Sequence, residues 1–209
     1  MLANANRTDA IPDLEGQFQA TQDAQLKTGI AGALVRLRDS NNNYWDYLQS
    51  QARAAIQSDA PAVVMASNDG QHKLSPAFVD WAKAHQLSQN AAIEQVLYLM
   101  PASVLALAEA DDPRAVTLLE EGLKSNNFVI QKDAALGLAT LHQTDAVPLI
   151  IRACDSASPQ IAATLAESLV YFDDTRSANA VRKYVPADKA AALIAARKQG
   201  RQPFHRETH

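Results

Sequence analysis

Apolar residues in the C-terminal half of the chain recur at helical spacing, and the whole pattern is repeated. Between residues 128 and 141 they stand three or four positions apart, which is typical of one buried face of an α-helix. The same pattern returns 31 residues later, with a polar turn and a further apolar stretch ahead of each copy. The sequence therefore predicts helix pairs of about 31 residues. Three aligned columns share the offset: Ile130 with Ile161, Leu138 with Leu169, and Leu141 with Phe172.

The pattern extends towards the N-terminus. Residues 9–14 (Asp-Ala-Ile-Pro-Asp-Leu) match residues 145–150 (Asp-Ala-Val-Pro-Leu-Ile) almost position by position, and residues 99–110 fit the same inner column. One helix pair cannot bury its apolar face alone, whereas stacked pairs bury a continuous core. We therefore predict a single domain. It covers residues 1–209, with regular repeats over about 9–39 and 99–200, an irregular insertion or distorted repeat over 58–74, and a frayed tail over 201–209.

Several helix starts are marked in the sequence. Ser75-Pro76, Asp112-Pro113 and Ser158-Pro159 each place a capping side chain before a proline, which suits the first turn of a helix. Pro101 either begins a helix or kinks one. We also expect an aromatic-rich helix around residues 44–48, in which at most two of its three aromatic side chains can face the core together.

The irregular middle of the chain permits two local structures. Residues 62–65 precede the turn-forming segment Asn68-Asp69-Gly70. They fit either the end of a helix or an extended piece before a tight turn. A further helix is predicted around Phe78 and Trp81.

Composition agrees with an all-helical fold. Alanine makes up about a fifth of the sequence, far above ordinary usage, while the 209 residues include only 7 glycines and 9 prolines. This mixture excludes a disordered or collagen-like chain and disfavours a sheet-dominated fold. Small side chains let helices approach closely, which explains the alanine excess and the glycines of the helical segment Gly29–Ala33.

The helix pairs resemble HEAT repeats, in particular the short bacterial repeats named after phycobilisome lyases. The resemblance rests on Asp145–Ile150, its twin from Asp9, and the second-helix pattern of Ala134–Leu141. The arginine usual near the start of the second helix is missing, since Gln131 and Ala162 stand there. The resemblance implies an all-α fold, an α-solenoid in which antiparallel helix pairs form a right-handed superhelix and the second helices line a concave binding surface. Most proteins of this kind bind other molecules without reacting with them, but some proteins with similar folds are enzymes, including bilin lyases and DNA glycosylases.

Helical geometry places a row of side chains opposite the predicted core on the second helices. The row contains an apolar strip rimmed by charged residues, which suits a protein or peptide partner better than a nucleic acid. Scattered surface apolar residues without a function explain it equally well. The candidate partner-binding residues are Leu105, Glu109, Lys132, Leu136, Thr140, Glu167 and Tyr171.

Charge and hydropathy narrow the classes of partner. The formal net charge is -4 with a pI near 5.7, so nucleic-acid binding is not expected. The chain has no run of 18 apolar residues, so we expect no membrane span. The first residues lack the apolar stretch of a signal peptide, which favours the cytoplasm by default and the periplasm or the exterior if a leader was removed. Cys154, the single cysteine, is expected to be buried.

The sequence offers no candidate catalytic, metal-binding or cofactor-binding residues. His205 and His209 are four positions apart, but the zincin motif needs a glutamate directly after its first histidine. A nucleophile elbow and a phosphate-binding glycine loop are absent from the sequence. Paired acids occur at 111–112, 120–121 and 173–174, and two of these pairs are expected to end helices or cap the next ones.

These patterns favour a non-enzymatic scaffold that binds a protein or peptide on its concave face and uses no cofactor. Two alternatives stay open. One is an enzyme on a HEAT-like fold, either a bilin lyase or a DNA glycosylase; an acidic groove would argue against the glycosylase. The other is a structural domain of a longer chain.

Overall fold

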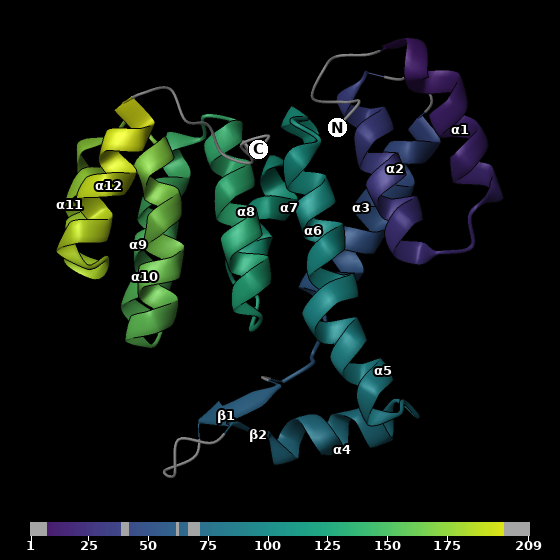
Figure 1. Cartoon of the computed structure of the whole chain (residues 1–209), viewed down its shortest axis with the longest axis horizontal. Helices are drawn as coiled ribbons and strands as arrows, with labels where there is room; N and C mark the ends of the chain where they lie inside the picture. Colours follow the sequence, from purple (N-terminus) through teal and green to yellow (C-terminus); the bar gives the residue numbers. More distant parts are fainter. Residues whose placement is uncertain (1–7, 39–41, 62, 67–71, 199–209) are drawn as a thin grey trace.

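The computed structural model describes residues 8–38, 42–61, 63–66 and 72–198, and it is helical apart from one short hairpin (Figure 1). The predicted tail over 201–209 lies outside the described residues. The N-terminal part contains η2 (Thr8–Ala10), α1 (Ile11–Ala20), α2 (Ala24–Arg36), α3 (Asn42–Ile56), β1 (Val64–Ala66), β2 (His72–Leu74) and α4 (Pro76–Ala84). The middle contains α5 (Gln89–Glu94), the π-helix η3 (Gln95–Leu99), α6 (Met100–Glu109), η4 (Pro113–Ala115), α7 (Val116–Gly122) and α8 (Phe128–Thr140). The C-terminal part contains η5 (Thr144–Ala146), α9 (Val147–Ser156), α10 (Pro159–Glu167), η6 (Ser168–Tyr171), α11 (Thr175–Tyr184) and α12 (Ala187–Lys198).

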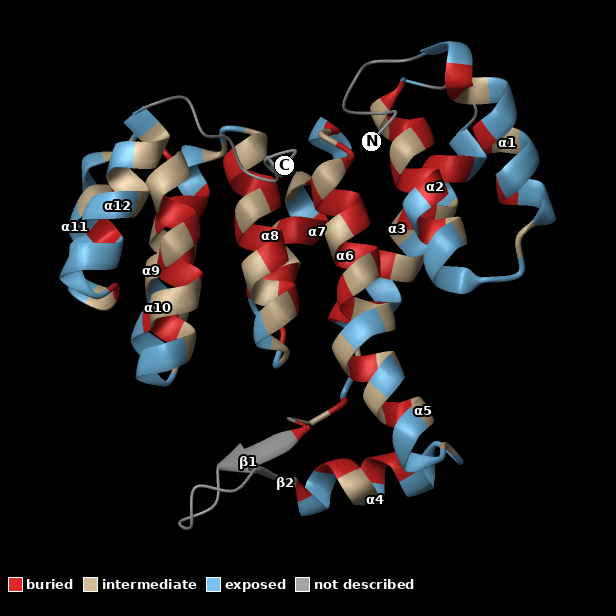
Figure 2. Cartoon of the chain, in the orientation of Figure 1, coloured by how far each residue is buried: buried red, intermediate tan, exposed pale blue. Residues whose placement is uncertain are grey.

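The helices pack against one another in sequence order. Helix α6 lies against α2, α3 and α8, and α8 also contacts α7 and α10. Further along, α9, α10 and α11 contact one another, and α12 contacts η6 and α11. Buried residues line the facing sides of these helices (Figure 2). The all-helical prediction is therefore confirmed, with burial concentrated between successive helices.

Small residues sit where helices approach most closely. A Cβ added to Gly32 of α2 would lie 3.0 Å from the carbonyl oxygen of Ala106 in α6. A Cβ added to Gly137 of α8 would lie 2.7 Å from the Cβ of Ala108 on the other side of α6. Helix α6 can thus pack tightly between α2 and α8, which is the physical reason for the alanine excess. The predicted packing role is confirmed for Gly32 but is wrong for Gly29, whose added Cβ would meet nothing within 4 Å.

The 31-residue offset is visible in the local structure. Asp111 and His142, 31 positions apart, both adopt a left-handed backbone conformation, with φ of 52° and 54°. Short 3-10 turns follow each of them, at Pro113–Ala115 and at Thr144–Ala146. The N-terminal twin behaves in the same way, because Thr8–Ala10 forms a 3-10 turn before the proline-containing α1 just as Thr144–Ala146 does before α9.

A smaller lobe stands apart from this stack and has its own core (Figure 1). It consists of the hairpin, α4, α5 and the π-helix, centred on the fully buried Phe78. The two strands pair antiparallel, with Val64 opposite Leu74. The irregular middle is thus extended rather than the end of a helix, while Asn68-Asp69-Gly70 lies outside the described residues. Met100 packs against both cores and joins them.

Pro101 lies inside a continuous helix. Of the two alternatives, the structure therefore supports a proline that interrupts a helix and not one that begins it. Helices α5 and α6 run through the π-helix as one element, Gln89–Glu109. A proline cannot donate the usual backbone hydrogen bond, and the wider π turn directly before it accommodates this loss. This element is the one helix among the described residues that is long and apolar enough to cross a membrane, with a mean hydropathy of 1.6. Its α6 part is packed between α2, α3 and α8, which accounts for its apolar composition.

The three predicted proline starts are real, although only one has the predicted cap. Helix α4 begins at Pro76 and α10 at Pro159, but neither preceding serine makes a side-chain capping hydrogen bond. Asp112 does cap, since its Oδ1 accepts a hydrogen bond from the backbone N–H of Arg114 at 2.9 Å. Proline itself therefore sets the start of α4 and α10, because its φ already matches the helix.

Candidate functional site

All seven candidate partner-binding residues are half-buried, which corrects their expected exposure. They lie on α6, α8, α10 and η6, the second helices of the predicted pairs. Helix α8 contacts α6 on one hand and α10 and η6 on the other, so neighbouring elements take part of the surface of each of these helices. The half-buried residues are Leu105, Glu109, Lys132, Leu136, Thr140, Glu167 and Tyr171.

Two of the seven, Leu105 and Glu109, come together in a groove between α1, α2 and α6, which we call the α2–α6 groove. Its volume is about 640 Å³. Leu26 at the start of α2 is 52% exposed, which is unusual for a large apolar side chain in the folded part of this chain. The lining residues are Leu14, Gln17, Asp23, Gln25, Leu26, Gly29, Ile30, Ala33, Ala102, Leu105, Ala106 and Glu109.

Carboxylates supply the charge of this groove, and none of its lining residues is basic. Asp23 caps α2, because its Oδ1 accepts a hydrogen bond from the backbone N–H of Leu26 at 2.9 Å. The backbone carbonyl of Glu109 accepts a hydrogen bond from Arg36 Nη1 at 2.8 Å, which fixes the C-terminal end of α6 against α2. The groove is therefore an apolar channel with an acidic rim, held by rigid helices on its sides.

A buried carboxylate that the sequence pattern did not single out lies next to this region. Asp133 of α8 is only 4% exposed, and its Oδ1 is 3.6 Å from Nζ of Lys132. Burial raises the pKa of Asp133 to about 6, with Lys132 lowering the pKa and the charge of Glu109 raising it. The 31-residue offset offered a signal, because Ala102 and Thr164 hold the equivalent positions and an acid among small residues is out of place.

The remaining candidate residues do not join the α2–α6 groove. The hydroxyl of Thr140 donates a hydrogen bond to the backbone carbonyl of Leu136 at 3.0 Å, within α8. Glu167 Oε1 accepts from Nζ of Lys189 at 2.6 Å, which links α10 to α12. Tyr171 packs against the main core. These contacts lie within the helix stack. The seven residues therefore do not form the one continuous strip that was expected along the second helices.

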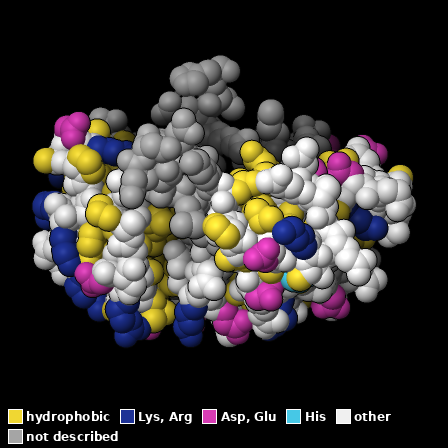
Figure 3. Space-filling model, turned by 90° about the horizontal axis from the view of Figure 1, so that it is seen from below, with side chains coloured by type: hydrophobic (Ala, Val, Ile, Leu, Met, Phe, Trp, Pro, Cys, Tyr) yellow, Lys and Arg dark blue, Asp and Glu magenta, His cyan; other side chains and the backbone are white. Residues whose placement is uncertain are grey.

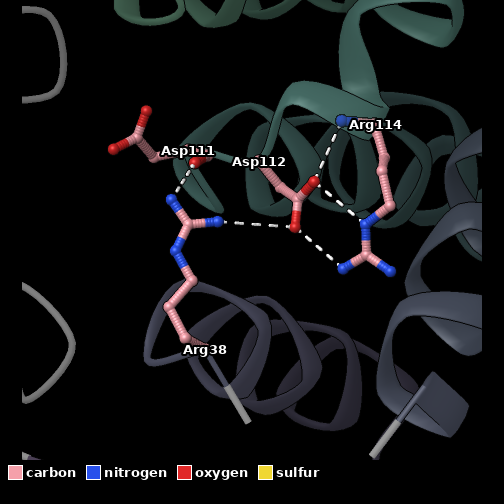
Figure 4. Close-up of polar contacts among 4 residues, drawn as sticks. All are labelled: Arg38, Asp111, Asp112 and Arg114. Carbon is pink, nitrogen blue, oxygen red and sulfur yellow. Dashed lines mark hydrogen bonds and ion pairs between the residues drawn. The ribbon is translucent and has the colours of Figure 1, made fainter. Parts of the chain in front are cut away.

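An ion-pair cluster, in which a buried Asp112 meets two exposed arginines, joins the C-terminal end of α2 to the turn after α6 (Figure 4). Asp112 accepts hydrogen bonds from Nε and Nη2 of Arg114 at 3.0 and 2.8 Å, and Nη1 of Arg38 is 3.6 Å from its Oδ2. These bonds to Arg114 hold the pKa of Asp112 below its usual value. The guanidinium of Arg114 also lies 4.3 Å from the ring centre of Trp45, so the cluster anchors the aromatic helix α3.

The same Asp-x-Arg arrangement recurs 62 residues later, which is twice the repeat offset. Asp174 caps α11 and accepts from Nη2 of Arg176 at 2.6 Å, and the hydrogen bonds to Arg176 lower its pKa to about 2. Two acidic pairs were expected to cap helices, and this is confirmed at Asp112 and Asp174. Both acids serve the turns between helix pairs.

The aromatic helix and the cysteine have structural roles. Tyr44 and Trp45 are buried, and Tyr47 is half-buried, packs against the main core and meets Phe18 edge-to-face at 5.3 Å, so all three aromatic side chains contact the core where at most two were expected. Cys154 is 2% exposed and its pKa is raised to about 12, mainly by burial, which confirms its predicted burial. Among the described residues no group of three His, Cys, Asp or Glu side chains could hold a metal ion; His205 and His209 lie outside them.

A second cavity, which the sequence reasoning missed, lies where the lobe meets the main stack; we call it the junction pocket. Its volume is about 630 Å³. Its walls come from α2, α3, α4, the π-helix and α6, so residues from distant parts of the sequence meet there. A cluster of glutamines spread over three helices and one turn leaves no short motif, which is why the sequence pattern gave no signal.

The charge distribution separates the two ends of the molecule. On the face seen from below, Lys and Arg side chains gather towards the α9–α12 end, whereas Asp and Glu are more frequent in the opposite half (Figure 3). The α2–α6 groove and the junction pocket belong to the less basic end. Comparison of the chain with protein-family models, with curated proteins and with solved structures found no match.

Proposed function

We propose that the chain is a HEAT-like α-solenoid scaffold that binds a protein or peptide partner in the α2–α6 groove. In this interpretation the helix pairs are α1/α2, α3/α6, α7/α8, α9/α10 and α11/α12, and the lobe is an insertion into the second pair. The contacts of α2 with α6, of α6 with α8 and of α8 with α10 support a row of second helices. The left-handed residues and 3-10 turns that recur at the 31-residue offset support the repeat.

The partner that fits the groove is an amphipathic segment with apolar anchors and a basic residue. The observation that carries this proposal is Leu26, which is half-exposed and lines the groove together with Leu105 and Ile30. Covering an exposed leucine in an apolar groove removes apolar surface from water, as in helix-in-groove recognition. The carboxylates of Asp23 and Glu109 favour a lysine or arginine at the edge of the segment.

Binding from a displayed library of 16-residue peptides tests the proposal. We expect the selected peptides to carry apolar residues three or four positions apart, together with a basic residue. Leu26→Ser should weaken their binding at least tenfold, because it removes a large apolar contact at the mouth of the groove. Binding is measured by fluorescence polarisation with a labelled peptide.

The matched control is Tyr98→Ser. Tyr98 is 61% exposed and lies on the π-helix, outside the α2–α6 groove, so the same kind of truncation there should leave binding unchanged. A third variant, Glu109→Gln, should weaken peptides with a basic residue and spare their neutral analogues. Equal loss in Leu26→Ser and Tyr98→Ser, or no loss in either, would show that the partner binds elsewhere.

A further inference from the structure

The junction pocket lies between two separately packed cores, a position that ligand sites favour. The main stack contributes the ends of α2, α3 and α6, and the lobe contributes Trp81 of α4 and His85, which directly follows this helix. The indole Nε1–H of Trp81 donates a hydrogen bond to Asp59 Oδ1 at 2.8 Å across this boundary. Asn127, the cap of α8, also donates from Nδ2 to the carbonyl of Val96 in the lobe at 2.9 Å. These bonds hold the two cores in register around the cavity.

Apart from the carboxylate of Asp59, the polar lining consists mainly of amides and hydroxyls, which both donate and accept hydrogen bonds. Four glutamines contribute, and among the described residues none of their side-chain amides has a hydrogen-bond partner in the protein. Such amides are available to a ligand at no cost in internal hydrogen bonds. None of the lining residues is Lys or Arg, so the cavity offers no cation for a phosphate or a carboxylate. The four glutamines are Gln25, Gln51, Gln57 and Gln95.

His85 and Asp59 add acceptors at one end of the pocket. Nδ1 of His85 lies 2.9 Å from the carbonyl oxygen of Trp81. Because a carbonyl only accepts, Nδ1 carries a hydrogen in this contact, and in that tautomer Nε2 is the acceptor. Asp59 uses Oδ1 for the indole of Trp81. Hydroxyl groups of a ligand can donate to both His85 and Asp59.

Apolar side chains and the π-helix form the rest of the lining of the junction pocket. Leu99 and Met100 line the cavity beside the methyl groups of Ala54 and Ala55. The π-helix Gln95–Leu99 turns Gln95 and Leu99 into the same cavity, and π turns inside helices are frequent at functional sites. The pocket therefore presents an apolar patch next to a set of neutral amides.

From this chemistry we infer that the junction pocket binds an uncharged, hydroxyl-rich small molecule of the size of a mono- or disaccharide. Each hydroxyl of such a ligand donates and accepts one hydrogen bond, which matches the glutamine amides. Its C–H surface packs on the Leu99 and Met100 patch. The volume of about 630 Å³ leaves room for two sugar rings. This site adjoins the proposed peptide groove, with which it shares Gln25, but the inference does not rest on the peptide proposal.

Titration calorimetry and saturation-transfer NMR with the full chain test the inference. The probes are D-glucose, D-galactose, maltose and sucrose, compared with glucose 6-phosphate and glucosamine. We expect at least one uncharged sugar to bind with Kd below about 5 mM, and the phosphorylated sugar at least tenfold more weakly, because the pocket has no cation to pair with phosphate.

Variants locate the binding in this pocket. Gln51→Leu and Gln57→Leu should each weaken sugar binding at least tenfold, since an amide is replaced by an apolar group of similar size. Gln17→Leu, in the α2–α6 groove, should leave it unchanged. Gln57 is exposed, so its variant decides the result if Gln51→Leu fails to fold. The inference is overturned if no uncharged sugar binds with a Kd below about 5 mM, if a charged sugar binds more tightly, or if Gln57→Leu binds like Gln17→Leu.

Discussion

The buried carboxyl group of Asp133 lowers the stability of the helix stack when it is ionised. Its carboxyl group is buried on α8, and its single nearby cation, Lys132, is a neighbour in sequence at 3.6 Å. A pKa of about 6 instead of 3.8 corresponds to about 3 kcal/mol in folding free energy. The folded chain holds this proton more tightly than the unfolded chain. The contribution of Asp133 to stability is therefore full below pH 4 and is lost as the pH rises through 6.

Asp133→Asn should stabilise the protein at pH 7.5 by about 1–3 kcal/mol and leave its stability at pH 4 nearly unchanged, because the amide has no charge to desolvate. Urea unfolding at the two pH values measures this difference. The control is Asp173→Asn, which alters an exposed acid and should change little at either pH. A destabilisation of Asp133→Asn at pH 7.5 would mean that the carboxylate is stabilised by its surroundings.

At the scale of elements, the closeness of successive helices decides the fold. The helical spacing of apolar residues predicted the helices and the offset between pairs, because the periodicity of a buried face is local information. Which helix lies nearest to which is settled by contacts such as Gly137 on Ala108. The glycines at 29, 32 and 137 look alike in the sequence, yet only two of them lie at close approaches.

Gly137→Ala and Gly29→Ala should therefore have opposite effects. The first places a Cβ 2.7 Å from the Cβ of Ala108 and 3.0 Å from its Cα, so α6 and α8 must move apart, at a cost of about 1–2 kcal/mol. The second meets nothing, and alanine should gain about 0.5–1 kcal/mol from helix propensity. Denaturant unfolding of both variants checks the signs. Two changes of the same sign would contradict the close approach of α6 and α8.

At the scale of the whole molecule, the chain has two cores of unequal size. The main stack and the lobe share the continuous helix Gln89–Glu109, which includes Met100, and are tied by the hydrogen bonds of Trp81 with Asp59 and of Asn127 with Val96. Because the two cores are otherwise packed separately, we expect partly independent opening of the lobe. Ligand binding in the junction pocket would couple the two cores.

Phe78→Ala should loosen the lobe alone. Phe78 is the largest fully buried side chain of the lobe core, and its loss is expected to cost about 3–5 kcal/mol there. Hydrogen exchange followed by mass spectrometry should show faster exchange in α4 and α5 with protection of α8 and α10 preserved. Leu138→Ala, in the main core, is the matched control and should lower protection in α8 and α10. Equal loss of protection throughout the chain in Phe78→Ala would mean that the lobe and the stack unfold as one unit.

The sequence by itself determined the helices, their 31-residue offset, the N-terminal twin and the burial of Cys154, because each depends on residues that are near one another in the chain. The tertiary structure alone decided which faces of those helices are covered. The candidate residues were expected to be exposed because helical periodicity identifies the face opposite the core, but it does not say which neighbouring helix lies over that face. The α2–α6 groove, the burial of Asp133 and the junction pocket all depend on contacts between distant segments, such as Trp81 with Asp59.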